Sequence, residues 1–177
     1  MHYTLFETAI GTCGVVWGAR GLTGVHLPDT NPARTRAGVT RRFPGAVPAK
    51  PPPDVQQAID GIVALLRGEK RGLREIALDF DALPAFNRRV YEIARTIDPG
   101  STLTYGDIAR RLGSPGTARA VGHALGRNPW PIIVPCHRVL GADGRMGGFS
   151  APGGVATKRK MLEIEGVDGV QPAPRLF

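Results

Sequence analysis

Cysteine, histidine and long apolar runs are all scarce in this sequence of 177 residues. The only cysteines, Cys13 and Cys136, and four scattered histidines provide neither a disulfide framework nor a recognisable zinc spacing. No apolar stretch approaches the length that crosses a membrane, and the N-terminus lacks the basic and apolar regions of a secretion signal. We therefore expect a cytoplasmic protein with no metal site and no membrane partner.

Acidic residues are sparse in the second half of the chain. The formal net charge is +8, and residues 85–177 hold 13 lysines and arginines against 7 acids. Within residues 110–145 there are six arginines and a single acid, Asp143. A clustered arginine surface suits a polyanion because each phosphate contact releases condensed counterions. Charge alone leaves two alternatives open, a nucleic-acid-binding surface and a merely soluble basic surface.

The first half of the chain combines short β-prone runs with one clear helix. Residues 3–6, 13–17 and 22–27 are β-prone and separated by glycines, which predicts an antiparallel meander. Residues 28–53 hold seven prolines and predict an irregular loop with room for a short helix between residues 33 and 43. Apolar residues recur at helical spacing over 55–66, and residues 74–80 alternate enough to predict a further strand. We expect an α/β domain over residues 1–83.

The second half, residues 84–177, is patterned mainly for helices. Apolar residues recur at helical spacing over 86–97, and Pro99-Gly100 stops this helix. Residues 104–107, Thr-Tyr-Gly-Asp, have the form of a capping box with Asp in place of the usual Glu or Gln. A second helix is therefore expected to begin there.

A turn-forming segment, Gly-Ser-Pro-Gly at 113–116, separates that second helix from a third. The third helix, from Thr117, has basic residues on the face opposite its apolar side: Arg119, His123 and Arg127. Two helices joined by a tight turn, the second with a basic outer face, predict a helix-turn-helix that binds DNA. An ordinary helical hairpin with a solvated charged face is the alternative.

Reactive chemistry is suggested most strongly by residues 132–139, Ile-Ile-Val-Pro-Cys-His-Arg-Val. Cysteine is a strong nucleophile only as the thiolate, and a nearby histidine or arginine lowers the pKa of the thiol. Cys136 beside His137 is therefore a candidate reactive centre. The pair alone does not exclude that Cys136 is a small buried hydrophobe, because sequence neighbours on a strand point to opposite faces.

Four segments in this order resemble the O6-alkylguanine-DNA alkyltransferases, also called methylated-DNA--protein-cysteine methyltransferases. They are Thr-Tyr-Gly-Asp-Ile-Ala at 104–109, Ala-Arg-Ala-Val-Gly at 118–122, Gly-Arg-Asn-Pro at 126–129 and Pro-Cys-His-Arg-Val at 135–139. The similarity extends from the N-terminal meander to Glu165-Gly166. It implies a ribonuclease H-like α/β domain followed by a mostly helical, winged-helix-like domain that contains the helix-turn-helix.

The resemblance also implies the reaction. The protein would flip O6-alkylguanine out of double-stranded DNA and transfer the alkyl group irreversibly to Cys136, without a cofactor. Since a thioether is not hydrolysed, each molecule, acting as a monomer, would repair one lesion in a single turnover. His137 would deprotonate Cys136 through a water, and Glu165 would orient the imidazole.

DNA-binding roles follow from the same resemblance. Arg119 would enter the base stack vacated by the flipped guanine, and Tyr105 would crowd the target phosphate and offer its hydroxyl to the extruded base. Asn128 would bridge the recognition helix and the active-site turn through side-chain hydrogen bonds to backbone. Arg127 belongs to the same DNA-binding set.

The guanine edge would be bound by the backbone carbonyls of Cys136 and Val139 together with Ser150. The loop that carries Ser150 departs from the family pattern, because Phe149 stands where Tyr is common and Ala151-Pro152 resembles an insertion of two residues. The width of the pocket and the preferred size of the alkyl group therefore stay open.

Three other functions compete with this interpretation. A DNA-lesion sensor related by fold would have Trp in place of Cys136, so the cysteine argues against it. A cysteine hydrolase would use Cys136 and His137 with turnover, but it leaves Arg119 without a role. A helix-turn-helix regulator with an incidental cysteine would bind undamaged DNA in a sequence-specific way.

Overall fold

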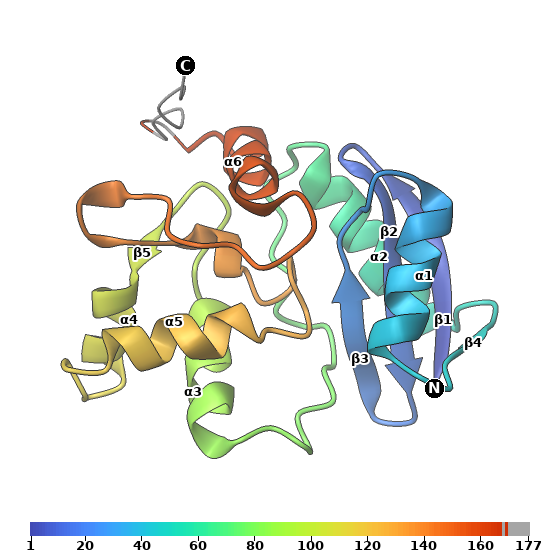
Figure 1. Cartoon of the computed structure of the whole chain (residues 1–177), viewed down its shortest axis with the longest axis horizontal. Coiled ribbons are helices and arrows are strands. Elements are labelled where there is room, and N and C mark those ends of the chain that lie inside the picture. Colours follow the sequence, from blue (N-terminus) through green and yellow to red (C-terminus); the bar gives the residue numbers. More distant parts are fainter. Residues whose placement is uncertain (168, 170–177) are drawn as a thin grey trace.

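A four-stranded sheet with two helices lies on one side of the molecule, and the remaining helices lie on the other (Figure 1). This is the fold seen in a computed structural model, which describes residues 1–167 and 169. The last part of the predicted second domain, residues 168 and 170–177, lies outside the described residues. The strands of the sheet, in the spatial order β3-β2-β1-β4, are β1 (His2–Thr8), β2 (Gly11–Gly18), β3 (Gly21–His26) and β4 (Val47–Pro48).

The antiparallel meander predicted from the β-prone runs is confirmed. β1 pairs with β2 and β2 with β3, both antiparallel, and the short β4 adds a parallel partner to β1 that the sequence pattern did not predict. The β2–β3 turn requires glycine at position 21. Gly21 has a φ of +124°, and a Cβ there would lie 2.7 Å from the carbonyl oxygen of Ala77.

Helices cover both faces of the sheet. Residues 12–17 of β2 are all buried, as expected for a strand with packing on each side. Val15 packs in the cluster that includes Ile62 of α2 (Pro53–Leu66), whereas Val16 packs with Val39 of α1 (Pro32–Arg42). The short helix expected near residues 33–43 is therefore α1, and it begins where the Asn31 side chain accepts a hydrogen bond from the Arg34 amide at 2.9 Å.

The strand predicted over residues 74–80 is wrong. This segment makes one isolated bridge, Leu22 to Leu78, although the amide of Leu22 donates to the Ala77 carbonyl at 2.9 Å. The guanidinium of Arg95 donates to the carbonyls of residues 73, 74 and 76 at 2.9 to 3.0 Å. Those carbonyls therefore accept hydrogen bonds from a side chain of the other half of the chain, and the segment forms no ladder with a neighbouring strand.

The second half of the chain is helical, as its apolar periodicity predicts. Thr104 and Asp107 form the predicted capping box, since Thr104 Oγ1 accepts from the Asp107 amide at 3.0 Å and Asp107 Oδ2 from the Thr104 amide at 2.7 Å. The first helix ends three residues earlier than predicted, at Ala94. The elements are α3 (Ala85–Ala94), β5 (Leu103–Thr104), α4 (Tyr105–Arg111), α5 (Ala118–Gly126), the 3₁₀ turns η1 (Cys136–Arg138) and η2 (Ala142–Gly144), β6 (Val139–Leu140) and α6 (Gly154–Ile164).

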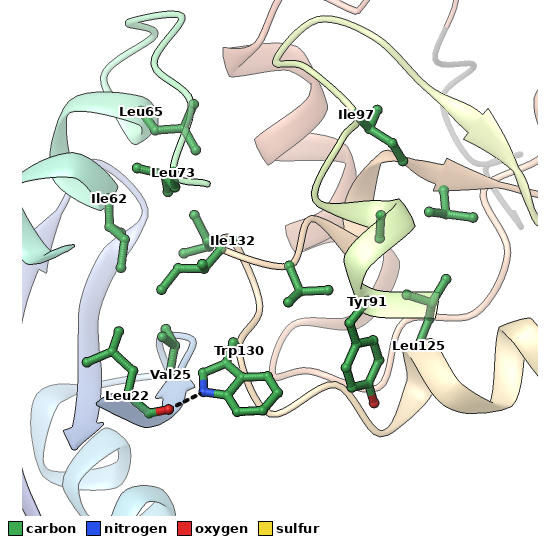
Figure 2. Packing of buried hydrophobic residues seen from close by; sticks show 14 of the residues in the cluster. Leu22, Val25, Ile62, Leu65, Leu73, Tyr91, Ile97, Leu125, Trp130 and Ile132 are labelled. Atoms are coloured by element: carbon green, nitrogen blue, oxygen red, sulfur yellow. Dashed lines mark hydrogen bonds between the residues drawn. The ribbon is translucent and has the colours of Figure 1, made fainter. Parts of the chain in front are cut away.

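The two halves share one hydrophobic core, with Trp130 at the junction. Figure 2 shows Trp130 between Leu22 and Val25 on one side and Tyr91 on the other. The indole Nε1 donates to the Leu22 carbonyl at 2.8 Å, and the Val25 amide donates to the Pro129 carbonyl at 2.9 Å. These bonds fix the segment after α5, and thus the turn that carries Cys136, against the sheet.

The described residues contain no helix that is both long enough and apolar enough to cross a membrane.

Candidate active site

Cys136 lies on a tight turn that is held by buried hydrogen bonds to its backbone groups. The Asn128 side chain donates from Nδ2 to the Val134 carbonyl at 2.8 Å, and its Oδ1 accepts from the Trp130 amide at 2.9 Å. The Cys136 amide donates to the Val134 carbonyl at 2.7 Å, and Cys136 is the first residue of η1. Cys136 is partly exposed, whereas the other cysteine, Cys13, is fully buried. The two thiols therefore differ in access to a reactant.

His137, next to the thiol, is held by a buried ionic network. Its Nε2 lies 2.7 Å from Glu165 Oε1, and the two side chains are 1% and 3% exposed. Arg138 donates to both oxygens of Glu165, from Nε at 2.9 Å and from Nη2 at 2.8 Å, and from Nη1 to the Ile97 carbonyl at 2.6 Å. A carboxylate that accepts three hydrogen bonds fixes the imidazole ring in one orientation.

The electrostatics of this network favour an ionised Glu165 and a neutral His137. Burial alone would raise the pKa of Glu165, but hydrogen bonds and charge from His137 and Arg138 outweigh it and lower the pKa to about 2. Burial lowers the pKa of His137, against the opposing effect of Glu165. A neutral imidazole that donates Nε2–H to Glu165 has its lone pair on Nδ1, which has no hydrogen-bond partner among the described residues. That atom can accept a proton.

Cys136 opens into a cavity of about 540 Å³ at the junction of the two halves. Tyr105, Asn128 and Ser150 also line it, so three of the residues singled out in the sequence meet the thiol there. The end of α1 in the first half of the chain contributes Arg42 to the same wall.

A second hollow runs along α4 and α5 beside this cavity. It is lined by Arg119 from the first turn of α5 and by Arg127 directly after that helix, and both are exposed. Tyr105, the first residue of α4, lines both hollows. An exposed basic surface therefore adjoins the thiol-bearing cavity, as an element that binds a nucleic-acid backbone would require.

Known proteins share both the sequence and the fold of this chain. Residues 85–167 match the family described as 6-O-methylguanine DNA methyltransferase, DNA binding domain. A methylated-DNA--protein-cysteine methyltransferase of Methanothermobacter thermautotrophicus is 38% identical over 87% of this chain and 79% of its own, and one of Mus musculus is 34% identical over 99% and 86%. The chain belongs to the methylated-DNA--protein-cysteine methyltransferase family.

The relatives resemble it in three dimensions as well. A crystal structure of Mycobacterium tuberculosis OGT in complex with DNA superposes with a TM-score of 0.75 at 36% identity, covering 93% of this chain and 92% of that one. The similarity in fold therefore extends over most of the chain and includes residues of both halves.

Lys158 lies at the site, although the sequence did not point to it. It is fully buried on α6, and its Nζ donates to the Val139 carbonyl at 2.7 Å and lies 5.9 Å from the centre of the Tyr105 ring. Burial lowers its pKa to about 8, against the opposing effect of Cys136. Helical spacing offered a clue, since residues 161 and 162, three and four positions later, are apolar.

Lys158 also acts on the thiol. Burial raises the pKa of Cys136, while a hydrogen bond from the Asn128 side chain and the positive charge of Lys158 lower it. The buried cation therefore partly offsets the cost of forming a thiolate in this cavity. Arg138 was missed too, because nothing in its sequence context distinguishes a buried arginine from the exposed ones nearby.

The carbonyls expected to bind the guanine edge already accept one hydrogen bond each. The Cys136 carbonyl accepts from the Val139 amide, and the Val139 carbonyl accepts from Lys158. A carbonyl oxygen has a second lone pair, so each could accept one more hydrogen bond. Ser150 is exposed and its hydroxyl donates to the Gly126 carbonyl at 2.8 Å, which ties the 147–154 loop to the end of α5.

No group of three or more His, Cys, Asp or Glu side chains is arranged to hold a metal ion within residues 1–167 and 169.

Proposed function

We propose that the protein repairs double-stranded DNA containing O6-alkylguanine by moving the alkyl group irreversibly onto Cys136. The observation that carries the proposal is the partly exposed thiol in a cavity beside the basic α4–α5 surface, next to the buried His137–Glu165–Arg138 network. The names of the relatives and the DNA in the M. tuberculosis complex support the same activity.

Thiolate formation is the first chemical step. Glu165 holds His137 with its Nδ1 lone pair free, and this nitrogen takes the Cys136 proton through a water. The imidazolium that forms is stabilised by the Glu165 carboxylate at 2.7 Å, and the thiolate by Lys158. Each charge therefore has an opposite charge prepared for it in a poorly solvated site.

Alkyl transfer then exchanges one bond for another. The sulfur of Cys136 bonds to the alkyl carbon while the bond from that carbon to O6 breaks. The electron pair stays on guanine, which also regains the proton that His137 took from Cys136. Burial raises the pKa of Tyr105, so its hydroxyl stays protonated and can donate to the departing base. The thioether product has no route back to the thiol, and each molecule therefore acts once.

The damaged base must leave the duplex to reach the cavity, at a cost of a few kcal/mol. In this proposal α4 and α5 act as the helix-turn-helix, Arg119 fills the vacated stack, and Arg127 contacts the DNA backbone. Tyr105, which lines both hollows, crowds the target phosphate. Asn128 holds the active-site turn in a fixed position relative to α5 through the two hydrogen bonds of its side chain to the backbone of Trp130 and Val134.

The flipped guanine would be held at its edge by backbone and loop groups. The carbonyls of Cys136 and Val139 use their second lone pairs for its amino group, and Ser150 closes the pocket. The 2.8 Å bond from Ser150 to the end of α5 supports this placement of the loop.

The finer description of the architecture belongs to the same proposal. We divide the chain into a ribonuclease H-like domain at 1–83 and a winged-helix-like domain at 84–177, and the family match that begins at residue 85 supports this boundary. The short parallel pair β5–β6 beside α4 and α5 would form the wing. The protein acts as a monomer in the cytoplasm, without a cofactor or a metal.

Mass spectrometry tests the proposal directly. Incubation with duplex DNA carrying O6-methylguanine should add one methylene to the Cys136 peptide. A Cys136→Ala variant should bind the DNA without transfer, whereas Cys13→Ala, its matched control, should transfer normally, because burial raises the pKa of Cys13 to about 12. A folded protein whose Cys136 peptide keeps its mass would contradict the proposal.

A further inference from the structure

The first half of the chain contributes charged side chains to the cavity that holds Cys136. Arg41 and Arg42, the last two residues of α1, both line it. Nη2 of Arg42 donates to the backbone carbonyl of Asn128 at 3.1 Å, on the turn that leads to the thiol. The proposed chemistry uses only residues 105–165, so these arginines have no role in it.

The charge around this wall is positive. Among the other described residues that line the cavity, Asp29 is the only acid, and its Oδ2 lies 2.9 Å from Nε2 of His26. Neither Arg41 nor Arg42 forms a salt bridge within residues 1–167 and 169. A group with negative charge that entered here would meet cations whose charge is not already neutralised.

Arg42 is held in place while keeping donors free. Its guanidinium carbon lies 5.4 Å from the centre of the Phe43 ring, and one hydrogen bond ties it to Asn128. Arg42 is exposed overall, and its partial burial lowers the pKa of the guanidinium. A guanidinium has several N–H donors in a planar fork that fits a carboxylate, so a second partner can bind without moving the first.

We propose that Arg42 makes the protein prefer O6-alkyl groups that end in a carboxylate, such as carboxymethyl, over apolar groups of the same size. The preference rests on the proposed function, since the alkyl group must enter the cavity beside Cys136. Cys136 sulfur bonds to the methylene carbon and the carbon–O6 bond breaks. The electron pair goes to guanine together with the proton that His137 took from the thiol, and the carboxylate remains ionised beside Arg42 throughout.

A purely structural role for Arg42 predicts something different. If the side chain only joined α1 to the Asn128 turn, its removal would weaken the fold and slow transfer of every alkyl group alike. A preference for a negatively charged end changes the ratio between two alkyl groups. The ratio is therefore the informative quantity, and effects on DNA binding or folding cancel in it.

The test compares duplexes of one sequence that carry O6-carboxymethylguanine or O6-isobutylguanine, which are similar in size and shape. Single-turnover rate constants give the carboxymethyl-to-isobutyl ratio for each protein. In Arg42→Met this ratio should fall about tenfold, the lower end expected for a hydrogen bond between charged groups. Arg42→Lys should keep part of the preference because it keeps the charge. Arg34→Met removes the same charge from an exposed residue of α1 outside the cavity and should leave the ratio unchanged.

The outcomes separate a structural role of Arg42 from a role in substrate preference. An unchanged ratio in Arg42→Met overturns the inference and leaves a structural link only. Where that variant fails to fold, Arg42→Gln, which can still donate to the Asn128 carbonyl, provides the same comparison. Transfer of methyl but of neither larger group also overturns the inference, because the cavity then admits no such end group. Failure to transfer methyl would overturn the proposed function instead.

Discussion

Glu165→Gln is the substitution whose consequences the structure defines most closely. The change keeps the size of the side chain and removes the charge that faces His137 and Arg138. The pKa of Glu165 falls from the ordinary 4.5 to about 2 in the folded protein. This difference in pKa corresponds to about 3 kcal/mol in the free energy of unfolding. The contribution is fully present above the pKa of Glu165 in the unfolded chain, and it is lost as the pH falls through the pKa of Glu165 in the folded protein.

The variant should therefore be less stable at neutral pH and should lose less stability between pH 4.5 and 2. Removing one partner of a buried pair leaves Arg138 uncompensated, so the free energy of unfolding at pH 7 should fall by about 3 to 5 kcal/mol. His137 adds a pH dependence of its own, which is larger in the variant because Glu165 no longer raises the pKa of the imidazole. Since burial lowers its pKa, protonation of the unfolded chain costs stability as the pH falls below 6.5.

Urea unfolding followed by the fluorescence of the buried Trp17 and Trp130, repeated from pH 7 downward, measures this effect. Glu163→Gln, an exposed acid two residues away, is the matched control and should behave like the unaltered protein. Alkyl transfer by Glu165→Gln should slow by about a hundredfold or more, because the imidazole loses its orienting carboxylate. A pH dependence equal to that of the unaltered protein would refute the reasoning about the network.

Three further substitutions test other contacts of the site. Lys158→Met should slow alkyl transfer about tenfold, because it removes a cation that lowers the pKa of Cys136. The pH–rate profile should also lose the step near the Lys158 pKa of about 8, and an unaltered profile would show that Lys158 serves packing alone. Arg119→Ala should reduce repair of duplex DNA far more than reaction with free O6-benzylguanine, measured by loss of the thiol, and equal losses would exclude a role in flipping. Asn128→Ala leaves buried backbone groups unpaired and should lower the free energy of unfolding by about 2 to 4 kcal/mol in urea titrations, whereas a change below about 0.5 kcal/mol would contradict its bridging role.

Local patterns in the sequence anticipated the elements whose stabilising contacts are themselves local. The capping box at Thr104 and Asp107 joins residues three apart, and the meander joins neighbouring strands through short glycine turns. Helical periodicity likewise identified α2 and α3 because the apolar face of a helix repeats within the helix.

Contacts between distant segments could not be read in the same way. The segment 74–80 has an alternating pattern, yet Arg95, directly after α3, donates to the carbonyls of residues 73, 74 and 76, and no strand forms there. Lys158 and Arg138 resemble surface residues until tertiary packing buries them against the Val139 carbonyl and Glu165. The placement of Arg42 beside the cavity likewise depends on how the two halves pack.

The most direct test of the central claim counts repaired guanines per protein molecule. A fixed amount of protein is mixed with a growing excess of duplex DNA containing O6-methylguanine, and restored guanine is measured at completion. Because Cys136 is consumed as a thioether, product should reach a plateau at one equivalent of active protein and rise no further with time. Product that continues to accumulate beyond one equivalent, or none at all from folded protein, would contradict the account.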